Sequence, residues 1–240
     1  MLLKLEIQSL KKFYPVLYLT EKEGKYFLKG KLNFQAFYDS KDDMLVLNPS
    51  LDNASGVNMI SDQYEIEIEF LPDFPHSLPL VREMGGRIQR IAKKYNIQNI
   101  CDLHVNKNKD NTICLCPKPE EKLRYPDKVD IVHFINNLVM PFFYGLSYYD
   151  RHGKWPWREY SHGDLGILEF YAENKNLNNS SALAKSCYES LSERGTKLVM
   201  TKKRIKSHWP CLCGSKEKFR RCHKLALEGL WALKEKFTHN

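Results

Sequence analysis

Residues 64–79, YEIEIEFLPDFPHSLP, decide the fold. In their first half apolar side chains alternate with acidic ones: the apolar positions are Tyr64, Ile66, Ile68 and Phe70, and the acidic ones are Glu65, Glu67 and Glu69. This period of two is typical of a β-strand with one buried face, so the glutamates should point to solvent. Three prolines follow within residues 72–79. They exclude a helix or a central strand and predict a rigid loop across the surface.

Other extended segments precede this strand. KLNFQAFY, residues 31–38, places Leu32, Phe34 and Ala36 on one face, and MLVLN, residues 44–48, lies between the two strands. Together they predict an antiparallel meander with one wet face.

The helices are predicted from apolar residues at helical spacing. A short helix is expected at the N-terminus through Leu3, Ile7 and Leu10, and GGRIQRIAKKYNI, residues 85–97, predicts another. DKVDIVHFINNLV, residues 127–139, predicts a core-facing helix that Pro141 should end or kink.

A further helix is expected in SSALAKSCYESLSERG, residues 180–195, with a serine cap and Gly195 as its stop. This order of elements indicates an α+β fold, with helices packed on one face of an antiparallel sheet.

The composition indicates a soluble protein of the reducing cytoplasm. No apolar stretch reaches the ~20 residues that cross a bilayer. The opening MLLKLEIQSLKK carries charges inside its only apolar part, unlike a signal peptide. We therefore expect no membrane partner. Seven cysteines, an odd number, favour thiolate or metal chemistry over a disulfide framework.

The positive charge is concentrated at the C-terminus. Residues 1–200 carry 26 basic and 26 acidic side chains, whereas residues 201–240 carry 11 basic and 3 acidic ones. Such a segment could contact nucleic acid, acidic headgroups or an acidic protein face, or could serve as a solvated surface.

The tail contains a set of metal ligands. CLCGSKEKFRRCHK, residues 211–224, brings four soft or borderline ligands within thirteen residues: Cys211, Cys213, Cys222 and His223. They suffice for a tetrahedral, structural Zn²⁺ site, and Gly214 lets the chain turn after the first pair. Because forty residues cannot build an adequate core alone, metal binding should supply most of the folding free energy of the tail.

The tail also resembles the SEC-C motif of the secretion ATPase SecA and many bacterial proteins. The resemblance covers the four ligands with Gly214, Ser215, Lys216 and Phe219. It implies zinc held by the three cysteines and the histidine, and a tail that docks onto partners.

HVNKNKDNTICLCP, residues 104–117, allows three interpretations. Cys101, His104, Cys114 and Cys116 form C-x2-H-x9-C-x-C, which could hold a second zinc. The segment could equally be a plain loop with buried cysteines. In the third interpretation it presents a nucleophilic thiol beside Asn106, whose amide can donate to an oxyanion while His104 pins the loop. No Ser-His-Asp type relay is present, which suits thioester exchange better than peptide hydrolysis.

In sequence, residues 64–79, HVNKNKDNTICL and YPDKVDIVHFINNLV resemble the ubiquitin-conjugating enzyme fold. That family carries an F/Y-P-x-x-P loop, an H-P-N signature and an I-C-L active-site segment ten residues after the histidine, as His104 and Cys114 are spaced here. The resemblance implies that Cys114 forms a thioester, Asn106 stabilises the oxyanion and His104 is a structural brace. Val105 stands where the signature has proline.

The combined pattern is similar to bacterial ubiquitin-conjugating-enzyme-like proteins of CBASS antiphage operons. The resemblance implies that the C-terminal tail of a CD-NTase (cGAS-like) enzyme is the substrate. Whether an activating enzyme is also a partner stays open, because some of these operons lack one. The expected domains are a catalytic domain at 1–160, a helical extension at 161–200 and the zinc tail at 201–240.

Three rival functions remain. The chain could be a non-catalytic binding module that docks a partner through its zinc tail. It could be a zinc-dependent nucleic-acid binder, although the tail lacks the helix-borne ligand pair of a DNA-reading finger. It could also be a deconjugating cysteine protease, which the missing base disfavours.

Overall fold

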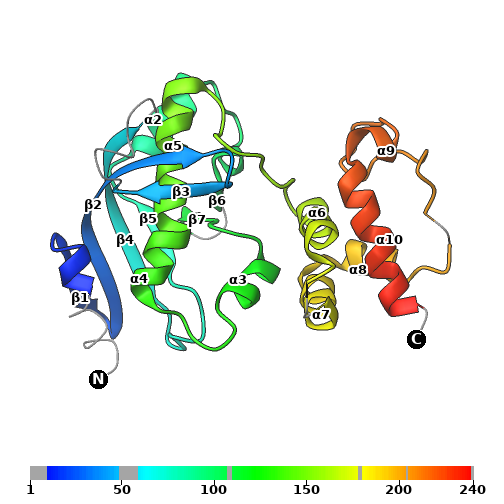
Figure 1. Ribbon diagram of the computed structural model, residues 1–240, viewed down its shortest axis with the longest axis horizontal. Coiled ribbons are helices and arrows are strands. Elements are labelled where there is room, and N and C mark those ends of the chain that lie inside the picture. The colour runs from blue at the N-terminus through cyan, green and yellow to red at the C-terminus, as the bar shows by residue number, and fades with distance from the viewer. Residues whose placement is uncertain (1–9, 49–58, 107–109, 178–179, 204, 239–240) are drawn as a thin grey trace. The chain divides into compact units, whose positions relative to one another are not determined.

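The computed structural model describes residues 10–48, 59–106, 110–177, 180–203 and 205–238. They fall into two compact units. Unit 1 comprises Met1–Leu115 and Asp127–Arg158, and unit 2 comprises Cys116–Pro126 and Glu159–Asn240. Each unit has its own arrangement of elements (Figure 1).

Unit 1 is built on an antiparallel sheet. Its strands are β1 (Leu17–Lys22), β2 (Lys25–Asp39), β3 (Met44–Leu47), β4 (Ile60–Phe70) and β5 (Leu80–Glu83). They lie in the order β1-β2-β4-β5, and β3 pairs with β2. Glu23 and Gly24 both have positive φ, as the two-residue turn between β1 and β2 requires. The sheet and its flanking helices confirm the predicted α+β class.

The alternation along β4 sets which face is buried. All four predicted apolar positions of this strand are at most 5% exposed, as are those predicted for β2. The prediction that all three glutamates face solvent is wrong for Glu69, which is only 7% exposed. Its carboxylate lies 2.9 Å from Arg82 and 3.2 Å from Lys25. Burial opposes ionisation, but the hydrogen bonds from Arg82 and Lys25 prevail and lower the pKa of Glu69.

Helices flank the sheet of unit 1. They are α2 (Arg87–Lys94), η2 (Ile100–Leu103), α4 (Ile131–Phe134), η3 (Ile135–Val139) and α5 (Met140–His152). α2 confirms the helix predicted within residues 85–97, and α5 packs against β4 (Figure 1). Of the stop or kink expected at Pro141, the stop does not occur, because the chain stays helical to His152. The helix is instead irregular ahead of the proline, where Ile135–Val139 is π-helical.

The N-terminal helix is described only in part. Leu3 and Ile7 lie outside the described residues, whereas residues 10–13 are helical and Leu10 is fully buried. Within the described ranges, no helix combines the length and the apolar character needed to cross a membrane.

Unit 2 consists mainly of helices. They are α3 (Lys118–Arg124), α6 (Asp164–Asn174), α7 (Ser180–Ser190), α8 (Glu193–Met200), α9 (Phe219–Cys222) and α10 (Lys224–Thr238). The predicted stop at Gly195 is wrong, because α7 ends at Ser190 and Gly195 lies inside α8. A Cβ at Gly195 would lie 2.7 Å from the Asp164 carboxylate. The lack of a side chain at Gly195 therefore lets α6 and α8 approach closely.

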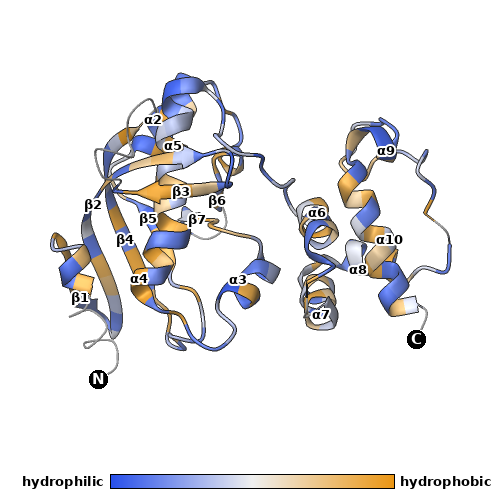
Figure 2. Ribbon diagram, viewed as in Figure 1, coloured by the Kyte–Doolittle hydropathy of each residue, from blue (hydrophilic) through white to orange (hydrophobic). Residues whose placement is uncertain are grey.

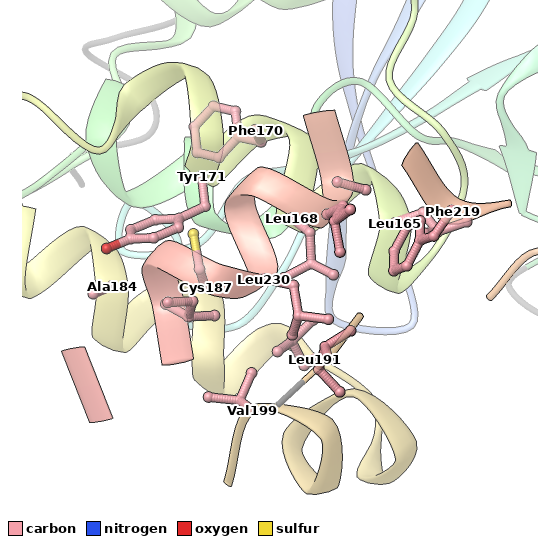
Figure 3. Packing of buried hydrophobic residues seen from close by; sticks show 14 of the residues in the cluster. Leu165, Leu168, Phe170, Tyr171, Ala184, Cys187, Leu191, Val199, Phe219 and Leu230 are labelled. Carbon is pink, nitrogen blue, oxygen red and sulfur yellow. The ribbon is translucent and has the colours of Figure 1, made fainter. Parts of the chain in front are cut away.

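The C-terminal residues share one hydrophobic core with α6, α7 and α8 (Figure 3). Phe219 and Leu230, from the predicted zinc tail, are buried with Leu168 of α6 and Cys187 of α7. Along α10, hydrophobic residues are interspersed with hydrophilic ones, as in an amphipathic helix (Figure 2). Residues 161–200 and 201–240 thus belong to the same compact unit, and the tail packs into a core that it shares with the preceding helices.

Gly229 allows this packing and should tolerate no side chain. A Cβ at Gly229 in α10 would lie 1.9 Å from the Leu168 carbonyl oxygen. Gly229→Ala should lower the free energy of unfolding by about 1–3 kcal/mol through overpacking, although alanine favours a helix by about 1 kcal/mol. Urea denaturation of the full chain measures the change. Glu228→Ala is the control, and equal stability of the two variants would contradict the backbone contact.

Candidate functional site

The cysteine loop of unit 1 begins with a short hairpin. β6 (Val105–Asn106) pairs with β7 (Thr112–Ile113), Val105 opposite Ile113 and Asn106 opposite Thr112. Val105 and Ile113 are 2% and 6% exposed and fasten one face of the hairpin to the core. Just beyond this pairing, the Cys114 N–H donates to the His104 carbonyl oxygen over 2.7 Å. The hairpin therefore places Cys114 beside His104, although ten residues separate them.

Cys114 is exposed, and none of the seven cysteines is in a disulfide. Cys101 and Cys116 are each partly buried. Among the described residues, the group in the C-terminal tail is the only one that gathers three or more Cys, His, Asp or Glu ligands around a common point. Within unit 1, Cys101, His104 and Cys114 do not form such a group, so the structure gives no support to a second metal site.

Asn106 and Thr112 share one face of the hairpin, opposite Val105 and Ile113. Cys114 follows β7 directly, and if the alternation of the strand continues by one residue its side chain falls on the same face. Asn106 Nδ2 donates to Thr112 Oγ1 over 3.3 Å, which orients the amide.

Contacts outside the hairpin hold both of its ends. His104 has φ 56°, the left-handed conformation, and its ring meets Trp155 edge-on at 5.1 Å between centroids. Arg82 Nε donates to the Asp110 carbonyl oxygen over 3.2 Å. The role of His104 as a brace stays a prediction. The sequence did not predict that Thr112 and Arg82 contact this loop. Thr112 could have been noticed from its position two residues before Cys114 in a segment of alternating residues.

The second candidate site lies in the tail. The ligand atoms of Cys211, Cys213, Cys222 and His223 all lie within 4.8 Å of one another. The Cys213 and Cys222 sulfurs are 3.5 Å apart, and Cys211 Sγ lies 3.2 Å from His223 Nδ1. This group could bind a metal ion.

The backbone around the ligands explains how they meet. Pro210 and Lys218 form an isolated antiparallel bridge, and the Cys211 N–H donates to the Glu217 carbonyl over 2.8 Å. Gly214 takes φ 84°, as expected for the turn after the first pair. Phe219, at 1% exposure, anchors α9 and with it Cys222.

The thiols of the tail differ in acidity. Burial raises the pKa of Cys211 to about 12, whereas hydrogen bonds from Ser215 lower the pKa of Cys213 to about 6. Thiolates this close to one another repel, so they stay ionised together only when a cation lies between them.

Comparison of the chain with protein-family models, with curated proteins and with solved structures returned no match. What is established is therefore an α+β protein with an exposed cysteine on a braced hairpin and a four-ligand Cys/His centre in its tail.

Proposed function

We propose that this chain is a ubiquitin-conjugating-like acyl transferase that carries a protein C-terminus as a thioester on Cys114. The observation that carries the proposal is the exposed Cys114 directly after the hairpin that holds Asn106, fixed there by its backbone hydrogen bond to His104. The antiparallel sheet that precedes this loop and the helix that follows it support the resemblance to that family.

The proposed chemistry has two steps. The Cys114 thiolate attacks the carbonyl carbon of an activated C-terminal acyl group, the activating group leaves, and a C–S bond forms. An amine then attacks the same carbon. The tetrahedral oxyanion accepts a hydrogen bond from Asn106 Nδ2, the Cys114 thiolate leaves, and the amine proton passes to solvent. His104 acts as the brace that holds the loop.

For the substrate we propose the C-terminal tail of a CD-NTase in the bacterial cytoplasm, where its modification would prime CBASS antiphage signalling. This part rests on the resemblance of the loop and the tail to that family. Charge supports a protein substrate over nucleic acid, because unit 1 matches its cations with carboxylates, as at Glu67 and Glu69.

For the tail we propose a structural Zn²⁺. Two Zn–S bonds of ~2.3 Å at the tetrahedral angle set their sulfurs ~3.8 Å apart. The separation of 3.5 Å between the Cys213 and Cys222 sulfurs is close to this value. Three sulfurs and one imidazole nitrogen make a closed donor set that suits zinc. When bound, the ion would hold the two halves of the tail together.

The test is intact mass after co-expression with the genes next to its own. The protein should carry one covalently attached chain, which a thiol such as dithiothreitol releases but a phosphine reductant does not, because phosphines cleave disulfides and leave thioesters. Metal analysis of the same sample should find one zinc per chain. No adduct, or an adduct released by the phosphine, would contradict the thioester.

Asn106→Ala should leave adduct formation intact and slow its discharge to an amine about 10²–10³-fold, the usual cost of losing one oxyanion donor. Single-turnover decay of the purified adduct measures this rate. Thr112→Val is the matched variant: it removes the hydrogen bond that orients the amide but keeps the amide, so it should slow discharge less than Asn106→Ala does. Equal loss of loading and discharge in Asn106→Ala would assign Asn106 a structural role.

The alternative is a non-catalytic binding module that docks a partner through its tail. The positive charge gathered in residues 201–240 favours it. Full function in cells that carry a Cys114→Ala chain would support this alternative.

A further inference from the structure

A pocket in unit 2 is lined by residues that belong to neither candidate site. It has a volume of about 490 Å³, within the range of ligand-binding pockets. It lies between α8 and the segment that follows this helix, and the residues that line it are Glu193, Arg194, Lys197, Leu198, Thr201, Lys203, Ile205 and Trp209.

The floor of the pocket is apolar and held by the unit 2 core. Ile205 is 4% exposed, and its carbonyl accepts the Trp231 indole N–H over 3.0 Å. Trp209 is 36% exposed, while its backbone N–H and carbonyl bond to Lys206 and Phe219. The partly exposed indole of Trp209 can pack against a large apolar side chain of a ligand. Burying that side chain there costs little conformational entropy, because the indole has few rotatable bonds.

The rim of the pocket is cationic. Lys197 pairs with Glu193 over 2.5 Å, whereas the ion pairs found within the described part of the chain do not include Arg194 or Lys203. At the C-terminus of α8 the carbonyl oxygens of Val199 and Thr201 accept from Lys234. Two cations beside the apolar floor are therefore available for an anionic partner.

We propose that this pocket, defined by Arg194, Lys203, Ile205 and Trp209, docks an acidic peptide segment of a partner protein that inserts one large apolar side chain. The apolar floor takes the side chain, and Arg194 and Lys203 pair with the flanking carboxylates. The carboxylate of Glu193 at the rim would repel a polyphosphate. It also leaves the pocket with too little net positive charge to bind several phosphates. The inference does not depend on thioester chemistry at Cys114.

The test uses the metal-loaded full chain and fluorescein-labelled peptides of about eight residues, in which Asp and Glu flank Leu, Phe or Trp. In fluorescence anisotropy at least one should bind with micromolar Kd, and exchange of its acidic residues for lysine or of its apolar residue for alanine should weaken binding at least tenfold. Added salt should weaken binding too.

Two variants locate the site. Trp209→Ala and the double variant Arg194→Glu with Lys203→Glu should each weaken binding at least tenfold. Lys185→Glu with Lys236→Glu makes the same change of charge on α7 and α10 and should have little effect. Unchanged metal content and melting temperature show that each variant is folded.

Three results would overturn the proposal. The first is that no peptide binds with Kd below about 1 mM. The second is binding that survives both pocket variants. The third is a fluorescein-labelled oligothymidine that binds more tightly than every peptide and competes at the pocket, because single-stranded nucleic acid would then be the occupant.

Discussion

Cys114→Ala should abolish the covalent adduct completely, because the acyl group has no other attachment point in the proposed chemistry. Cys114→Ser should instead trap the same chain as an oxygen ester that dithiothreitol does not release, since an ester exchanges with thiols far more slowly than a thioester. Intact mass before and after treatment with dithiothreitol distinguishes the three proteins.

Cys116→Ala is the matched control, because Cys116 lies two residues away and is partly buried. This variant should retain the adduct at the wild-type level. An adduct that persists in Cys114→Ala and disappears in Cys116→Ala would move the nucleophile to Cys116. The discharge role of Asn106 would then lose its geometric basis.

Cys213→Ser should remove the metal from the tail and unfold the segment around it. Cys213 is exposed, so the substitution costs little packing and reports mainly on ligation. Structural zinc contributes on the order of 10 kcal/mol in isolated zinc-finger peptides. Here the loss should be local, because α6, α7 and α10 keep the core that they share with the tail.

Metal analysis and hydrogen exchange measure the two effects. The metal content should fall from one per chain to zero, and amide protection should be lost around Cys211 and Cys222 but retained in α6 and α7. Ser215→Ala is the control, since Ser215 contacts the Cys222 sulfur without belonging to the ligand set. Full metal content in Cys213→Ser would contradict ligation by this cysteine.

The sequence by itself predicted those strands, helices and ligands that depend only on the spacing of nearby residues. The period of two in β4 predicted which apolar side chains are buried, because alternate residues of a strand face opposite sides. The helical spacing of Ile88 and Ile91 predicted α2 and its buried face. The tail ligands could be recognised from spacing alone, since all four lie within thirteen residues and Gly214 permits the turn.

Tertiary structure decided the features that depend on partners distant in the chain. Glu69 is buried because Lys25 and Arg82, on two other strands, neutralise it. Gly195 continues a helix instead of ending one because the Asp164 carboxylate lies against it.

The same division applies to the candidate sites. The sequence by itself determined that Cys114 follows His104 by ten residues and that the tail holds four metal ligands. Only the fold decided that Cys114 is exposed, that Asn106 pairs with Thr112 just before it, and that His104 lies against Trp155. It also decided that the tail shares a core with α6–α8. Spacing limits which residues can meet, whereas burial of apolar surface from distant segments selects which of them do.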